Sequence, residues 1–377
     1  MEHFDLAVIG GGMVGSAIGY GCASRGARVA VLDEGDVALR ASRGNFGLVW
    51  GQSKGDNMPA YAAWTRRSIA LWPALAERAS ELAGRDVQYR QRGGLTFCLD
   101  ERELEERREF VHRRHNQGHA SVRLLDRREL KELMPGCPLG PHVQGASFDP
   151  NDGHVDPLTL LRGFHAGLRR EGGTHLPGQS VTTIEQVPGG YRITRADGAK
   201  LDAARIAVAA GVATTRIAAM IGLDVPVRPV RGQNIVTERL APILPLPASA
   251  IRQTGDGTVQ IGVTTEDDGS FETPTTTEAL SRMASRALRV LPSLAGARMV
   301  RAWAALRPMT PDGCPAYAES PTHPGCFVAV CHSGVTLAAA HAGPLAEGVL
   351  GGDLSDLAEM HPARFADLPQ DQYVQAH

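Results

Sequence analysis

Cysteine is sparse in this chain, and the spacing of its cysteines excludes two common kinds of site. The six residues are scattered: Cys22, Cys98, Cys137, Cys314, Cys326 and Cys331. No two of them have the C-x-x-C spacing, so we expect neither a disulfide framework nor a structural zinc site. A reducing compartment is the simplest setting for such a chain.

Long apolar runs are also absent. No stretch approaches the roughly 20 apolar residues that a membrane-spanning helix needs. Met1-Glu2-His3 lacks the basic start of a signal peptide, and a strand-like sequence follows at once. We therefore expect a cytoplasmic protein without a membrane span.

Charge of one sign is lacking as well. The chain has 39 Lys and Arg against 41 Asp and Glu, which does not favour binding to nucleic acid. Its most charged segment, residues 101–132, mixes Glu and Arg around a sparse apolar stripe, so we predict a solvated helix there. With 377 residues, 43% apolar and 21% charged, the composition is typical of an ordinary enzyme of two or three domains.

The first 34 residues carry the most information. The run Phe4 to Ile9 predicts a buried parallel strand, Met13 to Ser24 predicts a helix, and Arg28 to Leu32 predicts a second strand. Between the first strand and the helix, Gly10, Gly12 and Gly15 fit the G-x-G-x-x-G spacing. These glycines permit a tight turn, the approach of a pyrophosphate, and close packing of helix on strand.

An acidic residue completes this unit. Asp33, followed by Glu34, comes 18 residues after Gly15, where a carboxylate can accept hydrogen bonds from a ribose 2′-hydroxyl. The helix amides of Met13, Val14 and Gly15 would face the phosphates. The unit therefore predicts a dinucleotide site for FAD or NAD rather than NADP; the alternative is a tight turn without a ligand.

Downstream, the pattern alternates between loops, helices and short strands. Residues 41–55 are glycine-rich and polar yet contain Phe46 and Trp50, which favours a loop that closes over a flat ligand. Further helices are predicted over 61–83, 158–170, 276–290 and 335–350, and strands over 89–99, 180–186, 191–195, 205–209, 225–238, 250–264, 298–306 and 326–331. Residues 146–156 are predicted to be a turn-rich connection. The nucleotide fold would open the chain and be completed near its end.

Eight motifs in order make the chain resemble the D-amino-acid and amine oxidase family of FAD enzymes. They are the glycine turn with Asp33, Ala41-Ser42 with its loop, 153–157 (Gly-His-Val-Asp-Pro), 209–211 (Ala-Ala-Gly), 229–233 (Pro-Val-Arg-Gly-Gln), 261–264 (Ile-Gly-Val-Thr), 306–313, and 332–337 (His-Ser-Gly-Val-Thr-Leu). The chain is most similar to the branch that contains glycine, sarcosine, iminodiacetate and opine oxidases.

The resemblance implies non-covalent FAD and a set of residues that hold it. These are Gly10, Gly12, Met13, Val14, Gly15, Asp33, Glu34, Ser42, Arg43, Gly44, Asn45, Phe46, Gly47, Leu48, Val181, Ala210, Gly211, Arg307, Ser333, Gly334, Val335 and Thr336. The last three would present amides at a helix N-terminus. Ala305 stands where monomeric sarcosine oxidases have a flavin-linked cysteine, and Gln260 best matches their oxygen-activating lysine.

Four residues are implied or suggested on the substrate side. Arg307 matches the position that clamps the substrate carboxylate, although it could instead form a structural ion pair. Arg252 would supply a second cation for a substrate with two carboxylates, or face outward from its strand. Trp50 would form a pocket wall or belong to the core. His332 would be a base or, more simply, a hydrogen-bonded structural residue.

The resemblance implies an α/β fold, α+β overall, with a Rossmann-like FAD domain (1–85, 146–222 and 306–377) and a mostly antiparallel substrate domain (86–145 and 223–305). The expected activity is oxidation of a secondary amino acid, such as iminodiacetate, sarcosine or an opine, or of glycine, by hydride transfer to flavin and imine hydrolysis. Oxygen or another acceptor would take the electrons, and a homo-oligomer or partner subunit is expected. Two alternatives are a D-amino-acid or D-hydroxyproline dehydrogenase, including a catalytic subunit that uses another acceptor, and a non-catalytic binding protein.

Overall fold

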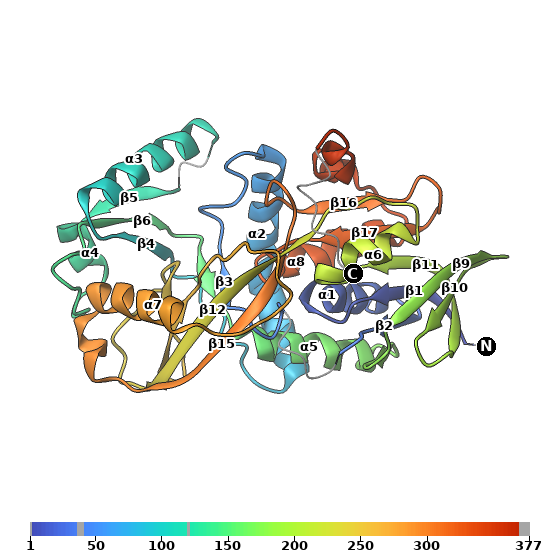
Figure 1. Cartoon of the computed structure of the whole chain (residues 1–377), viewed down its shortest axis with the longest axis horizontal. Coiled ribbons are helices and arrows are strands. Elements are labelled where there is room, and N and C mark those ends of the chain that lie inside the picture. The colour runs from blue at the N-terminus through green and yellow to red at the C-terminus, as the bar shows by residue number, and fades with distance from the viewer. Residues whose placement is uncertain (1, 36–40, 119–120, 369–377) are drawn as a thin grey trace.

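A mainly parallel sheet of eight strands forms one half of the computed structural model, which describes residues 2–35, 41–118 and 121–368 (Figure 1). Its strands are β1 (His3–Ile9), β2 (Val29–Leu32), β8 (Thr174–Leu176), β9 (Val181–Val187), β10 (Gly190–Arg195), β11 (Lys200–Val208), β16 (Ala316–Glu319) and β17 (Cys326–Val330). Strands β17, β11, β1, β2 and β8 run parallel in that order. Every residue of β2 and β17 is buried, as expected for parallel strands covered on both faces.

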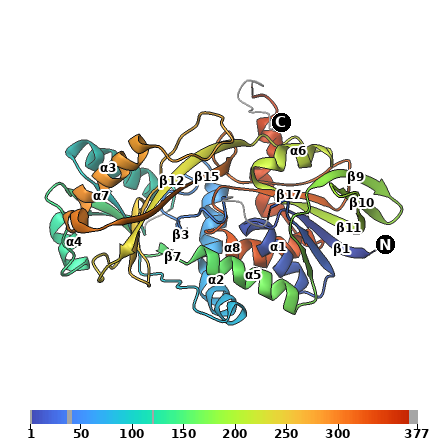
Figure 2. The ribbon, with the colours of Figure 1, turned by 60° about the horizontal axis from the view of Figure 1, so that its bottom comes forward.

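Helix α5 (Pro157–Arg170) packs against both α1 (Met13–Ala23) and α2 (Pro59–Ala83) beside this sheet (Figure 2). α1 is almost wholly buried and rich in Gly and Ala, which allows close packing. α5 begins at Asp156, whose carboxylate accepts the amides of Leu158 and Thr159 and so caps the helix. The remaining short elements of this half are α6 (Thr214–Ala219), α8 (Ala338–Ala340), α9 (Ala346–Val349), the π-helical turn His341–Leu345 and the 3₁₀ turns Gly211–Ala213, Ser355–Met360 and Pro362–Phe365.

The other half contains antiparallel sheets. The long strands β12 (Arg228–Arg239) and β15 (Met299–Met309) pair with each other, and β14 (Thr258–Gly262) and β13 (Ile251–Gln253) extend this sheet. A second sheet has the order β4 (Gly94–Cys98), β6 (Gly145–Asp149), β5 (Arg123–Asp126), and β3 (Leu48–Val49) pairs with β7 (Gly153–His154). Helix α7 (Thr277–Val290) and the 3₁₀ turn Pro292–Gly296 also lie in this half. β12 and β15 cross the centre of the molecule and bring this half toward the glycine turn (Figure 1).

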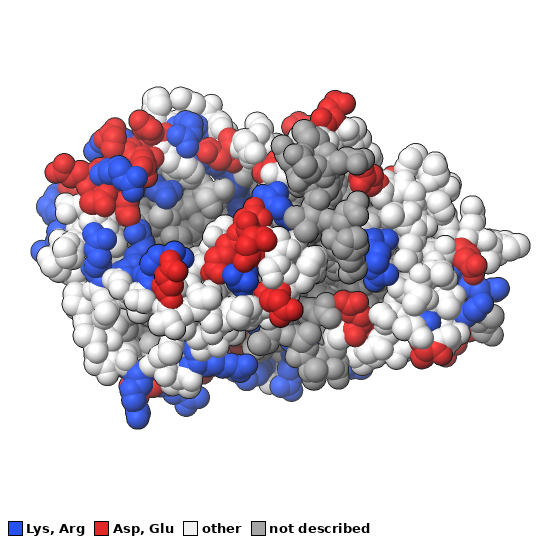
Figure 3. Space-filling model, in the orientation of Figure 1, with Lys and Arg blue, Asp and Glu red and all other residues white. Residues whose placement is uncertain are grey.

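The prediction of one helix over 101–132 is wrong. The segment contains α3 (Glu101–Asn116), strand β5 and α4 (Arg127–Leu133). Gly118, with φ of +80°, ends the first helix, and Asp126 with Glu129 forms a capping box that begins the second. Basic and acidic side chains are interleaved over α3 on the face in Figure 3, in line with the solvated character expected there.

Two further predictions need correction. Residues 146–156 are not merely a connection, because they include most of β6 and all of β7, and β6 pairs with β4 and β5. The last helix does not begin near 335: residues 334–337 form turns, and α8 begins at Ala338. Gly334, Val335 and Thr336 therefore lie before the helix rather than at its first turn. Strand β16 was not predicted.

The predicted fold class is confirmed, with a parallel nucleotide-binding type of sheet and a second, antiparallel part. The domain limits stay a prediction, and their boundary at 146 falls one residue inside β6. No helix within the described part of the chain is both long and apolar enough to cross a membrane.

Candidate active site

The glycine turn after β1 has the geometry that its spacing predicts. Gly10 has φ of +110°, and a Cβ there would overlap the carbonyl of Ala209. A Cβ on Gly15 would overlap the carbonyl of Gly10, so this residue allows α1 to pack closely on the turn. Gly12 differs, since the nearest atom to its Cβ position is Ser42 Oγ at 2.9 Å. The first and third glycines therefore shape the turn, and the second allows the Ser42 side chain to approach it.

Two polar side chains organise this end of the site. Asp33, directly after β2, accepts the amide of Gly11 at 2.6 Å and that of Gly35 at 3.0 Å. Ser42 Oγ accepts the amide of Met13 at 2.7 Å, which joins the 41–55 loop to the start of α1. The loop was predicted to close over a flat ligand, and this hydrogen bond brings it to the glycine turn.

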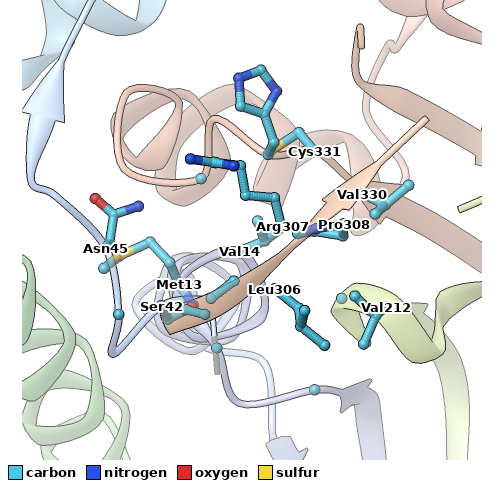
Figure 4. Close-up of a pocket in the computed structure, with 18 of the residues that line it drawn as sticks. Met13, Val14, Ser42, Asn45, Val212, Leu306, Arg307, Pro308, Val330 and Cys331 are labelled. Carbon is cyan, nitrogen blue, oxygen red and sulfur yellow. The ribbon is translucent and has the colours of Figure 1, made fainter. Parts of the chain in front are cut away.

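A cavity of about 810 Å³ extends from the glycine turn to β15 and the end of β17 (Figure 4). This volume lies in the upper part of the roughly 300–1,000 Å³ that ligand sites occupy. Of the residues predicted from sequence, those in its wall are Gly10, Gly12, Met13, Val14, Asp33, Glu34, Ser42, Gly44, Asn45, Phe46, Leu48, Trp50, Val181, Ala210, Gly211, Arg307, His332, Ser333, Gly334, Val335 and Thr336. Gly15, Arg43, Gly47 and Arg252 are not in the wall.

Arg307 projects from β15 toward the segment that carries Cys331 (Figure 4). Its Nη2 donates to the carbonyl of Thr264 at 2.8 Å, and the side chain is half-buried. Burial lowers the pKa of Arg307 from its usual range. Since a guanidinium in proteins keeps its proton near neutral pH, the cavity holds a fixed planar cation at this end.

Arg252 lies behind the cavity wall. Its Nε donates to Gln260 Oε1 at 2.9 Å, its Nη1 is 3.1 Å from His154 Nδ1, and its guanidinium lies 5.8 Å from the Phe46 ring centre. A Cβ added to Gly47 would come within 2.7 Å of Nη2. The side chain is almost fully buried, so it does not face outward from its strand. The prediction that it contacts substrate directly therefore gains no support from its position.

Trp50 fits both interpretations that the sequence left open. It lines the cavity, yet its side chain is buried and its ring packs so closely on Gly94 that a Cβ there would overlap it. Its backbone amide donates to Thr336 Oγ1 at 3.1 Å. This bond joins the 41–55 loop to the turn before α8.

Sequence reasoning missed Lys54 as a site residue. Its Nζ lies 2.8 Å from His332 Nε2, and both side chains line the cavity near Arg307. Burial, followed by the charges of Lys54 and Arg307, lowers the pKa of His332 well below 6.5, so this ring is neutral. Burial lowers the pKa of Lys54 to about 8. The available signal was a lysine at the end of the loop predicted to close over the ligand.

Comparison with known proteins places the chain in a family. Residues 5–347 match the DAO family model, described as FAD dependent oxidoreductase. The chain is 38% identical over 367 residues to one of the subunits of opine oxidase from Agrobacterium tumefaciens (strain Ach5), covering 97% of this chain and 98% of that protein. It is 29% identical over 355 residues to hydrogen cyanide synthase subunit HcnC of Pseudomonas aeruginosa, covering 83% and 84%.

A solved structure agrees with this placement. The crystal structure of glycine oxidase from Geobacillus kaustophilus superposes with a TM-score of 0.89 at 26% identity, covering 97% of this chain and 99% of that one. The family match spans both ends of the cavity, from the glycine turn to the turn at residues 333–337. The chain belongs to the DAO family of FAD-dependent oxidoreductases, and FAD is its cofactor.

Proposed function

We propose that this enzyme oxidises the C–N bond of a secondary amino acid, with Arg307 holding the substrate carboxylate. The observation that carries the proposal is the position of Arg307, a half-buried cation at the far end of the cavity that begins at the glycine turn. A guanidinium offers two parallel N–H donors to a carboxylate. The similarity to the opine oxidase protein over almost the whole chain supports a substrate of the N-substituted amino-acid type.

The residues around the cavity fit FAD. Gly12 lines the cavity beside the amides at the start of α1, and Asp33 places a carboxylate at the end of β2. Two buried oxygens in the wall, Gln179 Oε1 and Asn234 Oδ1, have no hydrogen-bond partner among the described residues. A ligand with N–H and O–H groups would satisfy such acceptors. We propose that the wall residues predicted from sequence hold the cofactor.

The cofactor should be bound without a covalent link. Ala305 lies in the cavity wall with a methyl side chain that cannot form a thioether. We expect acid denaturation to release all of the flavin into the supernatant, measured by its absorbance. A yellow protein pellet after repeated washing would contradict this expectation and would require a different attachment residue.

Bound FAD supplies the acceptor for a hydride from the substrate α-carbon. The amine must be neutral, because its nitrogen lone pair forms the C=N bond as the hydride leaves. Water then hydrolyses the imine to an amine and a 2-oxo acid. Arg307 would orient the α-carbon by fixing the carboxylate, while Trp50 and Phe271 in the wall would limit access of water.

Anaerobic reduction of the flavin tests this proposal. We expect iminodiacetate, sarcosine or an opine to bleach the flavin absorbance faster than D-alanine does. Faster reduction by D-alanine, a primary amine, would overturn the proposal in favour of a D-amino-acid dehydrogenase. Faster reduction by D-proline, a cyclic secondary amino acid, would overturn the N-substituted type of substrate in favour of a D-hydroxyproline dehydrogenase. Colourless protein that takes up no added FAD would instead support a non-catalytic binding role.

A second candidate is a catalytic subunit that passes electrons to an acceptor other than oxygen. Gln260, the best match to the oxygen-activating lysine of sarcosine oxidases, is hydrogen-bonded to Arg252 and offers no ammonium group. Two of the relatives described above are named as subunits of larger enzymes. Purified chain that reduces an artificial dye but forms no peroxide in air would favour this candidate; stoichiometric peroxide would exclude it.

A further inference from the structure

Two neighbouring cations, Lys54 and Arg307, line the cavity beside His332. The only wall carboxylates within the described part of the chain, Asp33 and Glu34, follow β2 at the nucleotide end. Lys54 makes no ion pair with any described carboxylate. The charge of Asp152 raises the pKa of Lys54 from a distance, without a hydrogen bond between the two side chains. Glu266 likewise acts on Arg307 from outside the wall. Because buried charges are normally paired, two cations in the wall of one cavity, with no acid in the wall beside them, predict anionic groups on the ligand.

Lys54 has donors free for such a group. The neutral His332 also forms a hydrogen bond with the backbone of Gly313, so it engages Lys54 through Nε2 alone. An ammonium group carries three N–H donors. One of them reaches His332, and no hydrogen bond from the other two is found among the described residues.

The turn that carries Lys54 is firmly anchored. The Asp152 carboxylate accepts the amides of Gly51 and Gln52 and the side chain of Gln52 at 2.7 Å. The carbonyl of Lys54 accepts Arg114 Nη2 at 2.9 Å. The ammonium group is thus presented from a fixed backbone, which lowers the entropy lost when it binds a ligand.

We propose that Lys54 binds a second carboxylate of the substrate, opposite the one held by Arg307, and makes the enzyme selective for secondary amines with two carboxylates. This inference rests on the proposed function and replaces Arg252 with Lys54 as the second cation. Arg252 is engaged by Gln260 and His154 behind Gly47, whereas Lys54 faces the cavity.

The decisive comparison uses iminodiacetate and sarcosine, which share a secondary amine and one carboxylate. In Lys54→Met, we expect kcat/KM for flavin reduction by iminodiacetate to fall by about 30-fold or more, as for loss of a buried charge partner. The value for sarcosine should change less than about threefold. Lys54→Arg should retain selectivity, and Lys131→Met, on the exposed face of α4, should match the wild type.

Equal losses with both substrates would overturn the proposal, because Lys54 would then act on the shared amine or on the flavin. A binding measurement keeps the test independent of turnover. Thiodiacetate, the thioether analogue of iminodiacetate, has no nitrogen to oxidise, and methylthioacetate lacks its second carboxylate. Calorimetry should show Lys54→Met weakening thiodiacetate about 30-fold and methylthioacetate less than about threefold. If Lys54→Met binds thiodiacetate as tightly as the wild type does, the proposal is overturned. This outcome does not depend on whether the enzyme oxidises iminodiacetate.

The pH dependence adds a further check. The titratable and charged groups around Lys54 are His332, Arg307, Asp152, Cys314 and Cys331. Because the pKa of Lys54 is about 8, the affinity for thiodiacetate, which has no amine that titrates, should fall as pH rises through 8. The affinity should not change with pH over this range in Lys54→Met. A fall that persists in this variant would assign the titration to another group and overturn the role of Lys54.

Discussion

Replacing Gly12 by valine is expected to give a folded protein that carries no FAD. Gly12 has φ of −72°, which any residue adopts, and the nearest atom to its Cβ position belongs to the end of the Ser42 side chain. The valine methyl groups would occupy the space in front of the α1 amides, where a pyrophosphate must lie. Flavin absorbance per protein after purification, and after incubation with excess FAD, measures the effect.

Thermal unfolding separates loss of binding from loss of folding. FAD at about 100 times its Kd stabilises a protein by about 2.7 kcal/mol, so added FAD should raise the melting temperature of the wild type but not of Gly12→Val. Gly296→Val is the control, because a Cβ there meets nothing within 4 Å. Gly15→Val should fail to fold, since its Cβ would overlap backbone. Stoichiometric flavin in Gly12→Val would contradict the assigned role of the turn.

Replacing Arg307 by methionine is expected to lower kcat/KM for the best substrate by roughly 30- to 4,000-fold. This range corresponds to the roughly 2–5 kcal/mol lost when one member of a buried, hydrogen-bonded charge pair is removed. The flavin content should fall much less than kcat/KM does, because Arg307 is one of many wall residues and the glycine turn, Asp33 and Ser42 lie on other segments. Stopped-flow flavin reduction would report both the apparent Kd and the limiting rate.

Arg307→Lys distinguishes a simple charge from a planar clamp. Lysine keeps the charge but loses the paired donors of the guanidinium, so we expect partial rescue of affinity and a still reduced limiting rate. If Arg307→Lys restores both the affinity and the limiting rate to wild-type values, the paired donors of the guanidinium are not needed to orient the substrate. Methionine at 307 with kcat/KM within about threefold of wild type would remove Arg307 from the substrate site.

The local sequence predicted the nucleotide turn well, because one contiguous segment contains all of its parts. The unit from β1 to Asp33 is a strand, a turn, a helix and a strand. The spacing of its glycines indicates where the backbone leaves no room for a Cβ, as the structure shows at Gly10 and Gly15. The prediction of a single helix over residues 101–132 was wrong, although this segment is also contiguous. Its charges favour helix throughout, and the breaks depend on Gly118 and on the cap at Asp126, which the charge pattern obscured.

The amino-acid sequence by itself determined the nucleotide turn, the α/β fold and, through the order of its motifs, the family. Only the tertiary structure decided which cations face the cavity. Arg252 lies on a strand, where side chains alternate between faces, and sequence cannot say which face meets the cavity. Lys54 and His332 are 278 residues apart, so their contact arises only when the 41–55 loop folds against the end of β17. Pocket chemistry of this kind depends on side chains from distant segments, whose meeting no local pattern encodes.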